Sequence, residues 1–288
     1  MKSAYLSYIL ALLLFGSNGI IASHISLPSI VIVLYRTCIG SLLLLSVFMV
    51  TKSKWTFYKY KKHFLFLALS GCSMGASWIF LYEAYQQIGV SISSLLYYCG
   101  PIVVMLLAPI VFREKLIPQK VIGFLLVLVG IILVNGKLFA GSSHYWGIFC
   151  GIMSALMYSL MVIFNKKATN ISGLENSLLQ LAISFLTVLF IVLLKGNYSL
   201  VIPQGSIFPL VFLGVINTGL GCYLYFSKLD KLPVQSVSIL GYLEPLSSVF
   251  LSFIILGETM NTAQVIGAIL ILGGAFYAEL SVCKKSEP

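Results

Sequence analysis

The chain has 288 residues, of which 59% are hydrophobic and 9% are charged, and its mean hydropathy is +1.03. Soluble domains carry roughly one quarter charged residues, so this composition excludes a water-soluble fold. It leaves no room for a soluble catalytic, nucleotide-binding or nucleic-acid-binding domain, and the net charge of +10 is interpreted as a sign of orientation in a membrane.

Charged and turn-forming residues divide the chain into ten apolar runs, each long enough to cross a bilayer as a helix. In chain order the runs cover residues 4–22, 29–50, 64–84, 90–112, 117–135, 145–165, 176–194, 207–227, 234–256 and 262–280. The first run follows Met1 and Lys2 as in a signal peptide, but no A-x-A cleavage site comes after it. We therefore expect it to remain as the first span.

The basic residues test this count, because inner loops of membrane proteins are enriched in Lys and Arg. With the N-terminus inside, ten spans place 15 of the 18 Lys and Arg residues on the inner side and only Lys137 and Lys195 outside. Arg36 remains within the second span. This asymmetry predicts a multi-pass protein of the plasma membrane with both termini in the cytoplasm.

The second half of the chain repeats the first. Residues 90–131 and the segment 144 positions later share 14 identities without a gap. The identical pairs include Tyr98 with Tyr242, Pro101 with Pro245, Glu114 with Glu258, and Gly130 with Gly274. Each half holds five spans, an odd number, so the halves 1–140 and 141–288 are expected to cross the membrane in opposite senses. The predicted fold is an all-α membrane protein of two inverted five-helix repeats, an arrangement typical of secondary transporters.

These segments resemble a known family. The run from Pro101 through Arg113-Glu114 to Gly130, and its counterpart from Leu243-Glu244-Pro245 to Gly274, are similar to the EamA family of the drug/metabolite transporter superfamily. The first two spans are similar as well, at Phe15-Gly16-Ser17-Asn18 and Tyr35-Arg36. The resemblance implies a central cavity, lined by spans 1, 3, 4, 6, 8 and 9, that opens to each side in turn. Members move amino acids, nucleosides, sugars and other metabolites, often outward, so the family does not specify a substrate.

Three charged residues within spans are candidates for function. Arg36 resembles an arginine that the family carries whatever its substrate, which favours a structural role over substrate recognition. Glu244 lies directly before Pro245, where a bent helix leaves carbonyl groups free, and is either a hinge and counter-ion or a proton or substrate site. Glu83 departs from an uncharged family position; it is either a proton-coupling or amine-binding group, or an interfacial residue reaching outside water.

Aromatic residues supply the other candidates. Tyr98 and Tyr242 are equivalent in the repeat and are expected on opposite cavity walls, where an aromatic face and a hydroxyl could both contact a substrate. Trp78 and Tyr97 are weaker candidates, because most aromatic residues of such a chain are packing residues or interfacial anchors. Pro101 and Pro245 are expected to act as hinges.

The sequence offers no cluster for a metal or for catalysis. Its three histidines lie in or beside loops and its six cysteines are single, so we expect no metal, no cofactor and no enzymatic activity. The expected partners are a small-molecule substrate and the lipid bilayer, with no nucleic acid; protons and a homodimer are left open.

The function predicted from these features is export of amino acids or similar small polar metabolites by alternating access, through proton exchange or facilitated diffusion. The alternative is a transporter of organic cations or amines, in either direction. Glu83 and the tyrosines motivate that alternative, because together they would attract a positive charge.

Overall fold

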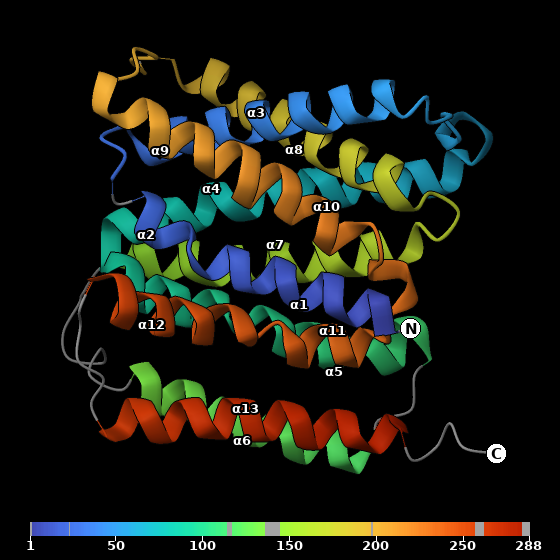
Figure 1. Cartoon of the computed structure of the whole chain (residues 1–288), viewed down its shortest axis with the longest axis vertical. Helices are drawn as coiled ribbons and strands as arrows, with labels where there is room; N and C mark the ends of the chain where they lie inside the picture. Colours follow the sequence, from blue (N-terminus) through green and yellow to red (C-terminus); the bar gives the residue numbers. More distant parts are fainter. Residues whose placement is uncertain are drawn as a thin grey trace.

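The computed structural model describes residues 2–22, 24–113, 117–135, 145–196, 198–256 and 262–283, and its apolar runs are helical. The helices are α1 (Lys2–Gly16), α2 (Asn18–Ala22), α3 (Ser29–Val50), η1 (Phe57–Lys59), α4 (Lys61–Tyr97), α5 (Gly100–Phe112), α6 (Pro118–Asn135), α7 (Tyr145–Lys167), α8 (Gly173–Lys195), η2 (Gln204–Ser206), α9 (Ile207–Phe212), η3 (Leu213–Leu220), α10 (Gly221–Phe226), η4 (Leu229–Lys231), α11 (Val234–Leu240), α12 (Leu243–Leu256) and α13 (Thr262–Cys283). Each predicted run coincides with one of these helices, with part of one, or with consecutive ones. Over the described residues these helices account for the ten predicted crossings, and Figure 1 shows them running roughly along one common direction.

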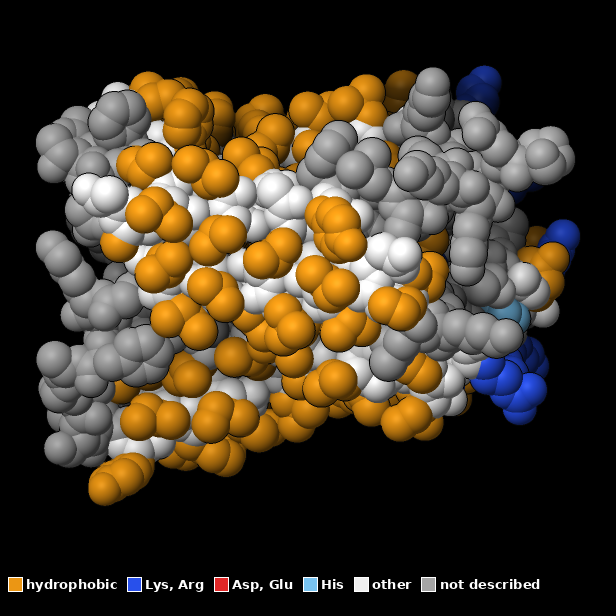
Figure 2. Space-filling model, turned by 90° about the horizontal axis from the view of Figure 1, so that it is seen from below, with side chains coloured by type: hydrophobic (Ala, Val, Ile, Leu, Met, Phe, Trp, Pro, Cys, Tyr) orange, Lys and Arg blue, Asp and Glu red, His pale blue; other side chains and the backbone are white. Residues whose placement is uncertain are grey.

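Within the described residues, six helical segments are long and apolar enough to cross a membrane alone, and three shorter apolar helices accompany them. The outer surface suits lipid, since large apolar side chains are exposed along most helices, such as Leu6, Ile110, Phe190 and Ile269. Figure 2 shows hydrophobic side chains spread over one face of the molecule, with Lys and Arg gathered at the end that carries the N-terminus in Figure 1.

Helix α4 contains two crossings and a reversal between them. In its first part Ser70 Oγ donates to Met161 O at 2.7 Å and Ser77 Oγ to Ser154 O at 2.9 Å, so it runs antiparallel to α7. Leu96, near the end of α4, packs against Gly151, which lies on the same stretch of α7 as Ser154. A straight helix would place Leu96 about 28 Å beyond Ser77. The run therefore turns back, as Figure 1 shows, and continues into α5.

The two halves are related by a two-fold axis, which the contact between α6 and α13 makes visible. A Cβ atom on Gly130 would lie 2.6 Å from Gly267 O, and one on Gly274 would lie 2.6 Å from Gly123 O. These residues are equivalent in the 144-residue repeat. Such a reciprocal contact indicates two-fold symmetry. The later residue of α6, Gly130, meets the earlier residue of α13, Gly267, and the reverse holds for Gly123 and Gly274, so the two helices are antiparallel. The repeats are inverted, as predicted.

A second reciprocal contact joins α4 to α8 and η3 to α3. A Cβ atom on Gly71 of α4 would lie 2.7 Å from Ile183 Cβ of α8, and one on Gly214 of η3 would lie 2.7 Å from Ile39 Cβ of α3. Ile39 and Ile183 are 144 positions apart, and the two glycines 143. The same kind of contact is therefore used twice, once on each side of the axis.

Several crossings are interrupted midway. Ser17 separates α1 from α2, and its hydroxyl donates to Leu14 O at 2.7 Å. Helix η3 is π-helical, and Thr218 Oγ1 donates to Leu213 O five residues earlier, at 2.9 Å. Turns at Tyr98-Cys99 and at Gly241-Tyr242 divide the fourth and ninth crossings and share the equivalent residues Tyr98 and Tyr242. Interrupted helices leave backbone groups that can serve a polar pathway.

We predict that Gly274→Ala destabilises the protein by about 1–3 kcal/mol, because the added methyl group would push α13 away from the backbone of α6. Gly273→Ala is the matched control: a Cβ atom there meets nothing within 4 Å, and alanine favours a helix over glycine. Thermal unfolding of the purified protein in detergent measures both. Equal melting temperatures for the two variants would contradict the close contact.

Candidate functional site

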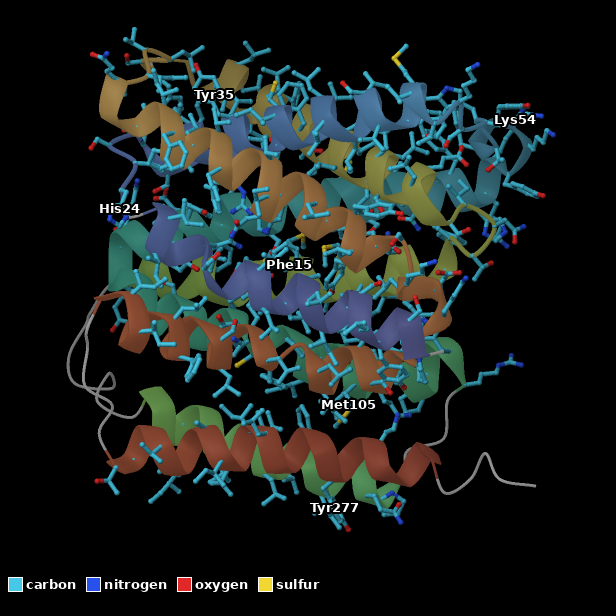
Figure 3. All side chains as sticks on the ribbon, viewed as in Figure 1. Phe15, His24, Tyr35, Lys54, Met105 and Tyr277 are labelled. Carbon is cyan, nitrogen blue, oxygen red and sulfur yellow. The ribbon has the colours of Figure 1, made fainter. Side chains whose placement is uncertain are left out.

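A cavity lies between the two halves. Its walls are formed by Phe15, Asn18, Met74, Trp78, Tyr97, Tyr158, Met161, Cys222, Tyr225, Phe226 and Glu244. The first five belong to one half and the other six to the other. Phe15 lies midway along the bundle (Figure 3), so the cavity is near the middle of the bundle.

The cavity is narrow in this conformation. Its volume is about 40 Å³, within a space of about 410 Å³ not filled by atoms that is partly open to solvent. At roughly 10–15 Å³ for each water, this is room for about three water molecules. Any larger solute requires side chains or helices to move apart, and the lining includes the flexible side chains of Met74 and Met161.

Glu244 is the charged residue of the cavity wall. It stands in the first turn of α12, just after the turn at Gly241-Tyr242, and its backbone N–H donates to Gly241 O at 3.2 Å. The start of a helix favours a carboxylate, because the free N–H groups carry partial positive charge. Among the described residues no donor is hydrogen-bonded to the Glu244 carboxylate. It is therefore available to a ligand in the cavity.

Aromatic side chains form most of the remaining wall. The rings of Tyr97 and Tyr158 lie edge to face with their centroids 5.2 Å apart, and the hydroxyls of Tyr158 and Tyr225 are 3.3 Å apart. Beyond them the hydroxyl of Tyr8, which is fully buried, donates to Val237 O at 3.0 Å. This chain of hydroxyls joins α7, α10, α1 and α11 on one side of the cavity.

Arg36 is buried directly behind the cavity, with 2% of its surface exposed. Its Nε donates to Thr218 Oγ1 at 2.9 Å, one terminal nitrogen to Tyr82 Oη at 3.2 Å, and the other to Asn18 Oδ1 at 3.5 Å. Its guanidinium carbon lies 4.6 Å from the ring centre of Trp78, a cation–π contact. Arg36 thus ties three crossings of its own half to η3 of the other half, and two of its partners line the cavity.

The structure brings three of the predicted substrate-contacting residues to the cavity wall, Trp78, Tyr97 and Glu244. Tyr98 and Tyr242 lie together, as the two-fold repeat predicts, with Tyr242 Oη donating to Tyr98 O at 2.9 Å. Both rings pack among apolar residues of α5, α6 and α13 instead of lining the cavity. Their role in binding stays a prediction. Pro101 and Pro245 each follow the turn that precedes their helix, where the missing N–H is tolerated.

Glu83 lies outside the cavity lining, near the start of α7. Its Oε1 accepts hydrogen bonds from Trp146 Nε1 and from Gln87 Nε2, both at 3.3 Å. Trp146 and Gln87 are exposed, and amphipathic groups of this kind collect at membrane interfaces. A transport role for Glu83 stays a prediction.

Residue type in the sequence does not single out Tyr8, Met74, Met161, Cys222 or Phe226. For Met74 and Met161, the spacing in the sequence does carry a signal. Met74 lies four residues before Trp78 and Met161 three residues after Tyr158, so each shares a helix face with an aromatic residue of the wall. Tyr8 carries no such signal, because its place depends on how α1 packs against α10 and α11.

Comparison with known proteins assigns the chain to a family. Residues 2–136 and 145–279 each match the EamA-like transporter family. The chain belongs to the EamA-like transporter family. It is a multi-pass membrane transporter and not an enzyme. Its cavity is lined from crossings 1, 3, 4, 6, 8 and 9, which confirms what the resemblance implied.

Relatives extend over most of the chain. An uncharacterized transporter of Bacillus subtilis (strain 168), YxxF, is 25% identical over 279 residues, covering 95% of this chain and 88% of the relative. A probable amino-acid metabolite efflux pump of Salmonella typhimurium (strain LT2) is 27% identical over 183 residues, covering 60% of this chain and 61% of the pump. A solved crystal structure at 18% identity shares the fold, with a TM-score of 0.83 over 97% of this chain and 99% of the other.

We predict that Arg36→Lys lowers the stability of this transporter by about 2–4 kcal/mol, because an ammonium group cannot span the partners that a guanidinium reaches. Thermal unfolding in detergent measures the loss. Thr218→Ser, which keeps the hydroxyl acceptor of Arg36, is the control and should unfold close to the wild type. A wild-type melting temperature for Arg36→Lys would refute the structural role of this arginine.

Proposed function

We propose that the protein exports amino acids or similar small polar metabolites across the plasma membrane by alternating access. The observation that carries the proposal is the cavity between the inverted halves, whose mostly aromatic and apolar wall contains one carboxylate, Glu244, and one amide, Asn18. Among the described residues no donor is hydrogen-bonded to that carboxylate. The relative named as a probable amino-acid metabolite efflux pump supports the same substrate class. Each step of the proposal rests on groups that face this space.

The amino group of the substrate would bind at Glu244. A protonated amine needs a carboxylate or aromatic faces when it leaves water, and this cavity offers both, with Tyr97 and Tyr158 among its walls. Because Glu244 has no hydrogen-bond donor among the described residues, binding an amine would satisfy it. A carboxylate in this position is also able to exchange a proton for the substrate.

The carboxylate of the substrate would bind at Asn18. Asn18 Oδ1 accepts hydrogen bonds from Arg36 and from Asn217, so its other amide atom, Nδ2, is directed elsewhere and has no acceptor among the described residues. Arg36, immediately behind Asn18 and Trp78, adds positive charge that favours an anionic group there. A zwitterion would thus find a partner for each of its charges.

Alternating access would follow from the inverted repeat. The cavity has room for only about three water molecules as it stands, so loading a solute requires side chains or helices to move. The interruptions at Ser17, Tyr98-Cys99 and Gly241-Tyr242 are the places where the first, fourth and ninth crossings could bend. Pro101 and Pro245 would hold the bend at the last two.

Two further assignments belong to this proposal. The gathering of Lys and Arg at the end that bears the N-terminus (Figure 2) supports a cytoplasmic N-terminus, and ten crossings would bring the C-terminus to the same side. The halves would divide at residues 140 and 141, a boundary that lies outside the described residues.

An organic cation or amine is the second candidate, favoured by one observation. Glu244 is the sole charged residue among those that line the described cavity, and six aromatic residues accompany it. Such walls bind quaternary ammonium groups in other proteins. The two candidates differ in whether the substrate must carry a carboxylate.

We predict that unlabelled zwitterionic amino acids inhibit counterflow of a radiolabelled neutral amino acid in proteoliposomes, whereas tetraethylammonium does not. The reason is that a quaternary amine has no group for Asn18 to bind. Inhibition by tetraethylammonium without inhibition by amino acids would favour the organic-cation transporter. Absence of saturable counterflow with either class would reject both.

We predict that Glu244→Gln lowers kcat/KM for the transported amino acid at least about tenfold, equivalent to about 1.4 kcal/mol of binding in the transition state. If Glu244 exchanges the proton, the variant's residual transport also becomes independent of pH, because glutamine does not titrate.

Glu83→Gln is the matched control, since it makes the same change outside the cavity lining. It should keep both the rate and the pH dependence of the wild type. Loss of pH dependence in Glu83→Gln with normal behaviour of Glu244→Gln would transfer proton coupling to Glu83.

A further inference from the structure

The segment of residues 51–62 joins α3 to α4 and includes the first two residues of α4. It carries an unusual density of positive charge and exposed aromatic rings; we call it the basic loop. Its lysines, all exposed, are Lys52, Lys54, Lys59, Lys61 and Lys62, and its exposed aromatic residues are Trp55, Tyr58 and Tyr60. Lys59 Nζ lies 5.8 Å from the ring centre of Tyr58. The transport cavity uses none of these residues.

The basic loop is held in one shape by a buried acid from the other half. Glu175, in the first turn of α8, is 7% exposed. Its Oε1 accepts hydrogen bonds from the backbone N–H groups of Thr56 at 2.6 Å and Phe57 at 2.9 Å, and its Oε2 from the hydroxyl of Thr56 at 2.5 Å. Phe57 packs inward against the cluster of Leu67 and Ile171. The lysines therefore project from a fixed frame.

The loop stands at the membrane surface. It follows the exposed apolar residues Met49 and Val50 at the end of α3, and Figure 3 shows Lys54 at that end of the bundle. The ring of Trp55 packs against Phe48 of α3, with the ring centroids 4.2 Å apart and the ring planes tilted by 34°. Trp and Tyr prefer the level of the lipid headgroups, so the rings and the lysines of the loop meet the same layer of lipid.

We propose that the basic loop binds the headgroups of anionic phospholipids and that Glu175 organises it for this purpose. Basic residues beside a membrane attract anionic headgroups, and here several lysines surround amphipathic rings that lie at headgroup depth. An acidic protein or a nucleic acid would be less suited, because Trp55 and Tyr58 would leave the lipid to reach it.

Native mass spectrometry of the full chain in detergent, titrated with phosphatidylglycerol or with phosphatidylcholine of the same acyl chains, tests the proposal. The wild type should bind phosphatidylglycerol more tightly. Lys54→Gln combined with Lys59→Gln should weaken that binding about 30-fold, from about fivefold for each lysine near the surface. Both side chains are exposed, so folding is preserved.

Lys228→Gln combined with Lys231→Gln is the matched control, because it removes the same charge from the loop before α11, which has no exposed aromatic residue of this kind. It should leave the preference for phosphatidylglycerol unchanged. An equal loss in both double variants would overturn the proposal, since overall charge alone would then explain binding. An equal affinity of the wild type for both lipids would overturn it as well.

Glu175→Ala distinguishes two explanations of lipid binding: a loop held in one shape by Glu175, and attraction by the charge of the lysines alone. The change removes a negative charge, so attraction alone predicts tighter binding of phosphatidylglycerol; loss of the frame predicts weaker binding. Glu175→Gln keeps one acceptor oxygen, which can serve the backbone N–H groups of both Thr56 and Phe57, but it replaces the acceptor of the Thr56 hydroxyl with an amide nitrogen. It should fall between Glu175→Ala and the wild type. Tighter or unchanged binding in Glu175→Ala would remove Glu175 from the proposal.

Discussion

The backbones of the two halves approach each other through glycines at equivalent positions, and the position of the cavity depends on this approach. In a membrane, packing between helices has little hydrophobic driving force and relies on close van der Waals contact. Gly130 and Gly274 bring α6 against α13, while Gly71 and Gly214 bring α4 and η3 against their partners. With these helices held tightly, the space that remains between the halves is the cavity near the middle of the bundle.

The polarity of the cavity comes from places where the repeat is broken. The position equivalent to Glu244 is Gly100, and the position equivalent to Arg36 is Gln180. A Cβ atom on Gly100 would lie 2.6 Å from the ring of Tyr158, so the first half has no room for a second carboxylate there. The two-fold frame is thus symmetric while its charges are not, and a solute in the cavity would meet different groups from the two halves.

The sequence located part of the candidate site. Trp78, Tyr97 and Glu244 were chosen from their residue types and line the cavity, whereas Tyr98, equally aromatic, packs among apolar residues. Tyr97 and Tyr98 differ by one position, which is about 100° around a helix. Neither the apolar pattern of the fourth crossing nor its aromatic content reveals that angle, because nearly every position is hydrophobic. The sequence likewise does not reveal which way Glu83 faces, since a carboxylate in a span can face a cavity or the membrane interface.

The sequence by itself determined the ten crossings, their inverted repeat and the family. Long apolar runs have few alternatives in a bilayer, where every backbone group must be hydrogen-bonded within the protein, and the spacing of Tyr, Pro and Gly survives duplication. Only the tertiary structure decided which face of each helix meets the cavity, that α4 turns back on itself, and that Arg36 is held by Thr218, Tyr82 and Asn18. Those features depend on contacts between residues as many as 182 positions apart, and the rotation of one helix against another is set by side-chain packing that a hydrophobic pattern does not record.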